Sequence, residues 1–293
     1  MQQEETLNFF KGHVDAWQKK AEDAVYSVIN DRHRAVHEVM KCYPTGSVLL
    51  DVGCGTGQLA IEASRQGWDA FGLDFAQEMI DKARENNAAD GTRARFVCAS
   101  VFDFDFTAHK FDVISAQGFV EYISRDQLDE FLSLAAGALT PGGAVAIGSR
   151  NRLFNILSFN EYSEMERDLG SIEMLIEEAI ALEGAGSQQE AIERISKLEG
   201  EYRQPERHPK TGIGVATRYQ YSPRELVEIL ARNGLKATGI YPVHYHAMPV
   251  SVLSDAALFD IQRQTAEYLS RHMISNPVFV PRSSSYVMMA IRR

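Results

Sequence analysis

Residues 47 to 57 read Ser-Val-Leu-Leu-Asp-Val-Gly-Cys-Gly-Thr-Gly, a short apolar run that ends in three alternating glycines. An apolar run of this length predicts a buried strand of a parallel sheet. Glycine accepts positive φ and lets the backbone approach a ligand closely. The helical pattern of residues 58 to 65 follows at once. We therefore expect a ligand above Gly53, Gly55 and Gly57.

The spacing of the glycines narrows the choice of ligand. Dinucleotide sites use G-x-G-x-x-G, and Gln58 stands where their third glycine would be. The pattern Asp51-x-Gly53-x-Gly55-x-Gly57 instead resembles motif I of the class I S-adenosylmethionine-dependent methyltransferases. The resemblance implies that Asp51 belongs to a site for S-adenosyl-L-methionine. It also implies that the methionine end lies over Gly53 and Gly55, near Gln117.

A second acid follows the glycine turn on the neighbouring strand. Residues 69 to 74 predict a strand that ends in Asp74. A carboxylate at this place can accept hydrogen bonds from both ribose hydroxyls of an adenosine-containing ligand. The alternative is that Asp74 caps the helix predicted for residues 76 to 87. Phe75, next to this acid, is expected to stack on the adenine.

The end of the third predicted strand, residues 94 to 99, departs from the family pattern. Methyltransferases of this class usually carry an acid followed by a small residue here, and this chain has Ser100 and Val101. The resemblance implies that the Ser100 hydroxyl and the Val101 backbone amide contact the adenine. Asp103 is the alternative to Ser100, unless it is a simple turn residue.

The next stretch carries a second signature of the family. Residues 124 to 127 predict a capping box for a helix that runs to Leu139, and Thr140-Pro-Gly-Gly then leads into a strand at residues 144 to 148. In several O-methyltransferases the loop after the fourth strand reads L-E-H, and its histidine acts in deprotonation. Glu121 and Tyr122 stand at the last two of these places, so that role is not carried over directly.

The resemblance implies an α/β fold with a doubly wound, seven-stranded, mostly parallel sheet, a Rossmann-like fold in which only the seventh strand is reversed. Two amphipathic helices are predicted at residues 5 to 28 and 31 to 42. A single stripe over residues 165 to 179, a turn at 184 to 186 and a second stripe at 191 to 198 predict a helical hairpin. We expect N-terminal helices that cover the cofactor site at residues 1–45 and a cofactor-binding core at 46–150. An insertion at 151–218 is expected to serve as a cap or a dimerisation arm. The rest of the sheet is expected at 219–293, with a second insertion at 249–283 whose helix is capped by Ser254.

Two histidines are candidates for the chemistry. His244 and His246 share one face of the strand predicted at residues 235 to 248, which ends at the ligand edge of the sheet. One of them is expected to act as general base, or to orient the acceptor, with Glu121 and Tyr122 opposite. Core packing and part of a metal site are the alternatives. No metal is expected, because His33 and His37 have ligand spacing on a helix but lack a third ligand.

Residues 203 to 218 contain Arg207, His208, Lys210 and two glycines. This composition is typical of a loop that can fold over an anionic substrate, or of a merely solvated loop.

Composition limits the function classes. The chain has 293 residues, of which 45% are hydrophobic, and a net charge of −10 that disfavours binding to nucleic acid. Three cysteines without C-x-x-C spacing favour a reducing, cytoplasmic location, and no apolar run reaches membrane-spanning length.

We expect a methyltransferase acting on a small-molecule acceptor, on oxygen or less favourably on nitrogen, such as a sugar, a lipid precursor or an aromatic metabolite. A non-catalytic S-adenosylmethionine-binding regulatory protein is the alternative. A homodimer is one arrangement that the 151–218 insertion allows.

Overall fold

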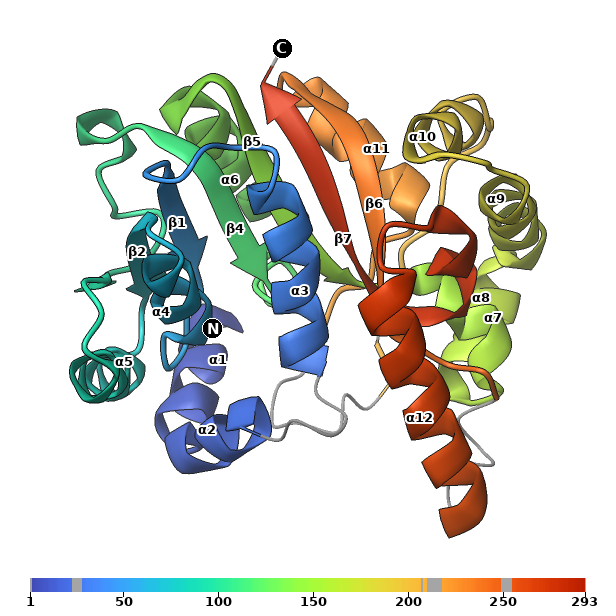
Figure 1. Cartoon of the computed structure of the whole chain (residues 1–293). Helices are drawn as coiled ribbons and strands as arrows, with labels where there is room; N and C mark the ends of the chain where they lie inside the picture. The colour runs from blue at the N-terminus through green and yellow to red at the C-terminus, as the bar shows by residue number, and fades with distance from the viewer. Residues whose placement is uncertain (1, 23–27, 207, 210–217, 249–254, 293) are drawn as a thin grey trace.

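The computed structural model describes residues 2–22, 28–206, 208–209, 218–248 and 255–292. Within them, a seven-stranded sheet has the order β3-β2-β1-β4-β5-β7-β6. Neighbouring strands from β3 to β5 are parallel, and β7 is antiparallel to both β5 and β6 (Figure 1). The expected fold, with one reversed strand, is confirmed. The strands are β1 Val48–Val52, β2 Asp69–Asp74, β3 Arg95–Cys98, β4 Phe111–Gln117, β5 Leu139–Arg150, β6 Leu235–Tyr245 and β7 Ser283–Arg292.

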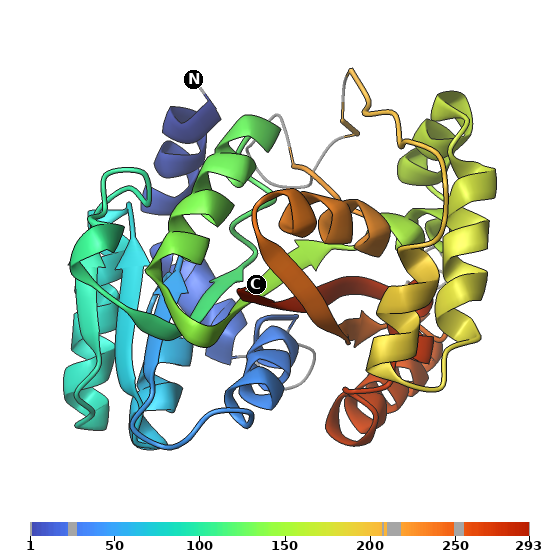
Figure 2. The same cartoon turned by 90° about the horizontal axis from the view of Figure 1, so that it is seen from above.

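Helices cover both faces of the sheet, as the strand positions require. Alternate residues along β4 and β5 enter two separate buried clusters, because side chains in a strand point to opposite faces. Figure 2, seen from above, shows the two helical layers with the sheet between them. One cluster includes residues of α3 (Val28–Met40), α4 (Gln58–Arg65) and α5 (Gln77–Asp90), and the other includes residues of α6 (Arg125–Ala138) and α11 (Pro223–Arg232).

Capping chemistry explains where several helices begin. The Ser124 hydroxyl accepts from the Gln127 amide at the start of α6, and Ser222 and Glu225 form the same box before Pro223 of α11. The first of these boxes is predicted above, and the Ser222-Pro-Arg-Glu225 pattern indicates the second in the same way. The second combines the serine cap with proline at the first helical position, where its missing N–H costs nothing.

The N-terminal segment differs from the prediction of one helix at residues 5 to 28. It forms α1 (Gln2–Lys11) and α2 (Val14–Glu22), separated at Gly12 and His13. Glycine is a poor helix former, and the His13 ring nitrogen Nδ1 bonds to the Phe9 carbonyl oxygen at 2.7 Å. The apolar period continued through the break, so the period alone was misleading.

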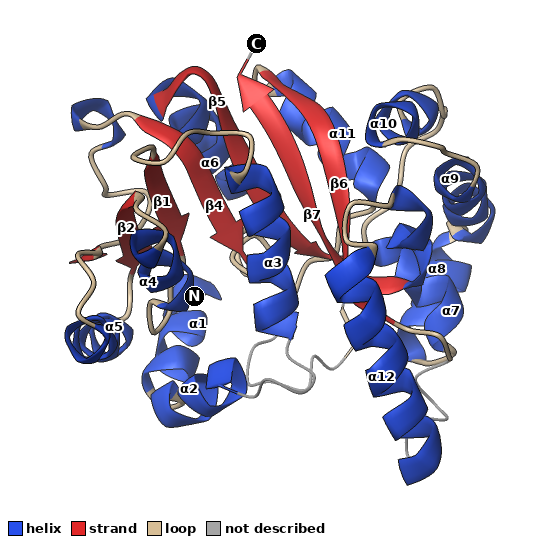
Figure 3. Cartoon of the chain, viewed as in Figure 1, coloured by secondary structure: helices blue, strands red, loops and turns tan. Residues whose placement is uncertain are grey.

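The insertion after β5 packs beside the sheet as part of the main body (Figure 3). It contains η2 (Arg152–Phe154), α7 (Asn155–Ser158), α8 (Glu161–Leu169), α9 (Ile172–Glu183) and α10 (Gln188–Ile195). Gly170, with φ of 69°, interrupts the single stripe predicted over residues 165 to 179. The turn predicted at 184 to 186 does separate α9 from α10. Leu175 and Ile195 are fully buried in the cluster that also contains α6 and α11.

The second insertion contains α12 (Ala256–His272) and η4 (Pro277–Arg282). Asp255 caps α12 through the Ala257 and Leu258 amides, whereas the predicted cap, Ser254, lies outside the described residues. A further short helix, η1 (Phe106–Ala108), precedes β4. No helix in the described ranges is both long enough and apolar enough to cross a membrane. In Figure 1 the carboxyl ends of β1, β4 and β5 point to the lower edge of the sheet, where α1, α2 and α12 also lie.

Candidate cofactor and acceptor site

The glycine turn leaves β1 in a conformation that side chains rarely adopt. Gly53, Gly55 and Gly57 have φ of 69°, 53° and 88°. The Gly53 amide donates to the Leu73 carbonyl oxygen at 2.8 Å, which ties the turn to β2. A Cβ at Gly57 would lie within 2.9 Å of Phe96 and Ala83. Gly57 therefore serves close packing under the turn, whereas Gly53 and Gly55 line a pocket.

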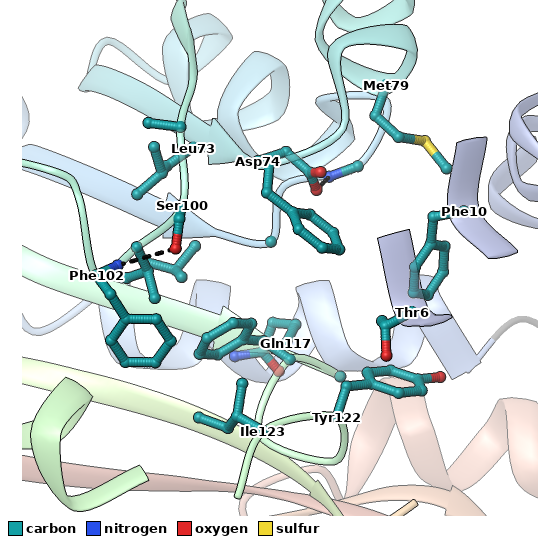
Figure 4. Close-up of a pocket in the computed structure, with 18 residues that line it drawn as sticks. Thr6, Phe10, Leu73, Asp74, Met79, Ser100, Phe102, Gln117, Tyr122 and Ile123 are labelled. Carbon is teal, nitrogen blue, oxygen red and sulfur yellow. Dashed lines mark hydrogen bonds between the residues drawn. The ribbon is translucent and has the colours of Figure 1, made fainter. Parts of the chain in front are cut away.

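That pocket lies at the carboxyl edge of the sheet (Figure 4). Its walls come from the glycine turn, the ends of β2 and β4, the segment after β3, and α1. The structure brings together seven of the eight predicted cofactor residues in its lining, namely Gly53, Gly55, Asp74, Phe75, Ser100, Val101 and Gln117. Their contacts with a cofactor stay predictions, since the structure contains no ligand.

Asp51 is the predicted residue that does not line the pocket. Its side chain is 4% exposed and lies in the middle of the β1–β4 ladder, opposite Ser115. Burial raises the pKa of Asp51 to about 7; a hydrogen bond with Ser115 opposes this rise, and the nearby Asp74 carboxylate adds to it by a smaller amount. Asp51 can therefore affect the glycine turn only from within the sheet, and it does not contact a ligand in the pocket.

Asp74 joins two parts of the pocket. Its Oδ2 accepts from the Gly55 amide at 3.0 Å and its Oδ1 from the Ala76 amide at 2.9 Å. Burial raises its pKa to about 6. The alternative role as helix cap is not observed, because Ala76 is the N-cap of α5 and the cap has no side-chain hydrogen bond. The carboxylate thus orders the glycine turn and also faces the pocket.

The Gln117 side-chain oxygen is a hydrogen-bond acceptor that is available to a ligand. Its Nε2 donates to the Ala146 carbonyl oxygen at 2.8 Å and to Ser115 Oγ at 3.2 Å, which fixes the orientation of the side chain. Its Oε1 is buried and has no hydrogen-bond partner among the described residues. A buried amide oxygen without a donor is costly, so this atom is suited to a ligand that brings a donor, such as an ammonium group.

Ser100 and Val101 lie in the segment after β3, which forms one wall of the pocket. The Ser100 hydroxyl accepts from the Phe102 amide at 3.3 Å, the bond drawn in Figure 4, and both Ser100 and Val101 are lining residues. Asp103, the alternative contact, is not one of the lining residues. The missing acid is therefore not replaced by Asp103 within this pocket.

Glu121 and Tyr122 have different surroundings. The Glu121 side chain is fully buried and is 2.6 Å from both Arg32 Nη2 and Arg218 Nε. Burial would raise the pKa of Glu121, but Arg218, Arg32 and Arg150 hold it below its ordinary value. Tyr122 lines the pocket, and burial together with the Glu121 carboxylate raises its pKa to about 12. At neutral pH the first is a paired carboxylate and the second a phenol.

His244 and His246 are brought together, but away from the pocket lining. His246 Nε2 and His244 Nδ1 are 3.2 Å apart, and His244 Nδ1 is 2.6 Å from Ser284 Oγ. His244, the residue before the end of β6, has a left-handed φ of 59°, and the His246 ring packs on Phe154. Burial lowers the pKa of His246 to about 4 and that of His244 well below its ordinary value. Neither histidine is a described lining residue of the pocket, so the expected position opposite Tyr122 is not observed.

The other histidine pair lies against the Glu62 carboxylate. His33 Nδ1 and His37 Nε2 lie 3.5 Å and 3.1 Å from the Glu62 Oε2 atom. In the predicted loop, His208 is described and packs edge-on against Tyr219, whereas Arg207 and Lys210 lie outside the described residues.

Sequence reasoning missed much of the apolar lining. Thr6 and Phe10 reach the pocket from α1, facing Ser100 and Phe102 across it (Figure 4). Other missed residues come from α5, from the loop after β4, and from the ends of β1, β2 and the segment after β3, and they are Met79, Gly118, Phe119, Ile123, Val52, Leu73, Ala99 and Phe102. Only the general expectation that N-terminal helices approach the ligand pointed to α1, and no local motif marks Thr6 or Phe10.

Comparisons with known proteins agree with this geometry. Residues 49–143 match the family model described as "Methyltransferase domain". The chain is 31% identical over 107 residues to a ubiquinone biosynthesis O-methyltransferase of Sinorhizobium medicae (strain WSM419), covering 36% of this chain and 42% of that protein. It is 33% identical over 115 residues to the enzyme of the same name from Vibrio vulnificus (strain YJ016), covering 39% and 47%. The chain thus matches less than half the length of these relatives.

Solved structures show the same fold over the whole chain. Magnesium protoporphyrin IX methyltransferase (ChlM) from Synechocystis PCC 6803 with bound SAH has a TM-score of 0.58 at 13% identity, with full coverage of both chains. A TehB-like SAM-dependent methyltransferase from Corynebacterium glutamicum has a TM-score of 0.52 at 16% identity, covering 97% of this chain and 98% of the other. Residues 49–143 thus form a methyltransferase domain, the whole chain has the fold of S-adenosylmethionine-dependent methyltransferases, and the cofactor is S-adenosyl-L-methionine.

Proposed function

We propose that this protein transfers the methyl group of S-adenosyl-L-methionine to a small molecule. An oxygen of a sugar, a lipid precursor or an aromatic metabolite is the favoured acceptor, and nitrogen is the second choice. The observation that carries the proposal is the pocket beside Gly53 and Gly55, which the Asp74 carboxylate lines together with Gln117, whose Oε1 has no hydrogen-bond partner among the described residues. The names of the two relatives support oxygen as the acceptor atom.

The pocket residues suit the parts of the cofactor, which supplies the methyl group. Gln117 Oε1 can accept a hydrogen bond from the ammonium of the methionine end. Asp74 can accept hydrogen bonds from the ribose hydroxyls, and Phe75 and Val101 offer apolar surface to the adenine. The apolar lining that includes Phe10 excludes water, which strengthens polar contacts inside the pocket.

Alignment is the main task that the described residues can perform. Displacement at a methyl group needs the acceptor atom in line with the departing sulfur, and a fixed geometry of this kind removes a large part of the barrier. Glu121 is occupied by two arginines, and Tyr122 is protonated at neutral pH. Tyr122 can therefore orient an acceptor by donating a hydrogen bond, and Glu121 is better suited to holding the arginines in place.

The role of His244 or His246 as general base stays a proposal. Both rings are neutral at pH 7, which a proton acceptor requires, but their lowered pKa makes them weak bases. A double substitution by alanine tests the role. Loss of the acidic limb of the pH–rate profile would support a base, and an unchanged profile with unchanged turnover would exclude it.

Transfer of label tests the proposed function. The protein is incubated with methyl-labelled S-adenosyl-L-methionine and the small-molecule fraction of a cell extract, and label is followed by mass spectrometry. We expect label in a metabolite with the wild type and much less with Asp74→Ala. Cofactor binding without transfer to any fraction would instead support the non-catalytic, regulatory alternative.

A further inference from the structure

We propose that the methyl acceptor carries an anionic group, a carboxylate or a phosphate, and that Arg150 binds this group together with Arg218 and Arg32. This inference rests on the proposed function, because it assigns a class of substrate to the same site. It uses residues that lie outside the cofactor lining and that the sequence motifs do not mark.

Positive charge exceeds negative charge around Glu121. Arg32, Arg150 and Arg218 all act on the Glu121 carboxylate, which lies among them. The same three arginines act on the neighbouring Tyr122 hydroxyl. Three guanidinium groups therefore surround one carboxylate. Asp31, next to Arg32 in sequence, does not balance this charge, because its carboxylate pairs with Arg34 at 2.8 Å and accepts from Ser270 at 2.6 Å.

The Arg150 side chain has no polar partner within the described ranges. Arg32 donates to Glu121 and Ser285, and Arg218 donates to Glu121. The half-buried Arg150 guanidinium makes no hydrogen bond or ion pair to any described residue. Its described contact is with the Tyr162 ring, whose centroid is 5.2 Å from Cζ. A guanidinium has five N–H donors in a planar fork, which matches the oxygens of a carboxylate or a phosphate.

A third, independent observation comes from α8. The Tyr162 hydroxyl is buried and has no hydrogen-bond partner among the described residues. It lies close enough to Arg218 to act on the charge of that guanidinium. A buried hydroxyl left without a partner beside unpaired cationic donors is what a bound oxyanion would satisfy, because it can accept from the hydroxyl and from arginine together.

The arginines lie directly behind the wall of the cofactor pocket. Gly118 and Tyr122 are lining residues, and Arg32 Nη1 occupies the space where a Cβ at Gly118 would stand. Arg218 Cζ is 5.6 Å from the centroid of the Tyr122 ring. Arg150 pairs across the β5–β7 ladder with Ser285, the residue whose hydroxyl accepts from Arg32. An anion held here would keep the rest of a small acceptor next to the pocket.

Binding of probe anions tests the proposal without turnover. Protein saturated with the demethylated cofactor, S-adenosylhomocysteine, is titrated at constant ionic strength with benzoate, phenyl phosphate and the neutral benzyl alcohol. We expect the wild type to bind at least one anion about 10-fold or more tightly than the alcohol, because charge-assisted bonds from arginine are strong. The preferred anion distinguishes a carboxylate from a phosphate.

Three variants test which residues cause the preference for an anion. Arg150→Gln should lose the preference for the anion, whereas Arg93→Gln, which removes the same charge from an exposed position, should keep it. Tyr162→Phe should weaken the anion a few-fold and leave the alcohol unchanged. Affinity for S-adenosylhomocysteine should be equal in all four proteins.

Two results would overturn the anion site while leaving the proposed function intact. One is a wild type that binds S-adenosylhomocysteine but shows no preference for either anion. The other is a preference that Arg150→Gln retains. Failure of the wild type to bind S-adenosylhomocysteine would instead remove the proposed function at the first step, so the two failures are distinguishable.

Discussion

Arg150 and Arg152 stand two residues apart at the end of β5, and their surroundings are opposite. Arg152 is 1% exposed and donates to Glu166 at 2.9 and 3.0 Å, to the Arg203 carbonyl oxygen at 2.8 Å, and to Glu225 at 3.4 Å. Arg150 has no polar partner among the described residues. Residues two apart in a strand point to the same face of the sheet. Arg150 and Arg152 have different surroundings because β5 ends at Arg150 and Arg152 begins η2.

The contrast separates charge that the protein pairs internally from charge that we propose binds a ligand. The Arg152 network joins the insertion at Glu166 to α11 at Glu225, and Asn155 also donates to Glu166 at 2.8 Å. Every charge there has a partner. Near the pocket, Gln117 Oε1 and the Tyr162 hydroxyl have no hydrogen-bond partner in the part of the chain that the structure describes, and Asp51 and Asp74 are buried acids with raised pKa values. Unsatisfied groups of this kind mark functional sites more often than structural ones.

The largest expected effect concerns stability at Arg152. Arg152→Met removes one partner of a buried network and leaves the Glu166 and Glu225 carboxylates without their cation. We expect the free energy of unfolding to fall by about 3–5 kcal/mol. The matched variant Arg150→Met should change it by about 0.5 kcal/mol or less. Chemical denaturation measures both, and equal losses would contradict the distinction between the two arginines.

The next effect is a pH dependence at Asp51. The pKa of Asp51 is about 7 in the folded protein against an ordinary value of 3.8, so its contribution to stability is complete below pH 4 and is lost as the pH rises through 7. Asp51→Asn cannot ionise. We therefore expect the variant to gain stability over the wild type by about 1–4 kcal/mol at pH 8, and by little at pH 4. Denaturation across this pH range checks it, and a difference that does not vary with pH would contradict the sign.

A smaller effect, on the affinity for the cofactor, is expected from substitution of Asp74. Asp74→Ala removes the carboxylate that holds the Gly55 amide and faces the pocket. We expect affinity for S-adenosyl-L-methionine to fall by about 10- to 100-fold, since hydrogen bonds to a charged group contribute about 1.5–3 kcal/mol. Fluorescence or calorimetric titration measures the change. Asp103→Asn, a change outside the pocket lining, serves as the control and should bind normally.

The cofactor half was predictable from sequence because its signals are local. The turn at Gly53 and Gly55, the acid at the end of β2 and the capping box at Ser124 each depend on residues close together in the chain. Parallel strands then bring Asp74 and Gln117 to one edge, so the pocket lining followed from topology. The break between α1 and α2 was missed, because Gly12 interrupts the helix without interrupting the apolar period.

The acceptor half was not predictable in the same way. Arg32, Arg150 and Arg218 come from three separate segments, and each alone reads as an ordinary charged residue. The predicted histidine pair also illustrates this limit. Its position on β6 and its mutual contact follow from the alternation of a strand, but the loop geometry that turns both rings away from the pocket lining depends on Phe154, Ser284 and the left-handed His244.

Calorimetry with S-adenosylhomocysteine tests the central claim most directly. The account predicts one bound molecule per chain for the wild type, affinity reduced by about 10-fold or more in Asp74→Ala, and unchanged affinity in Arg150→Gln. This outcome would separate the cofactor pocket from the arginines behind it. An absence of binding by the wild type, or equal affinity in all three proteins, would contradict the account.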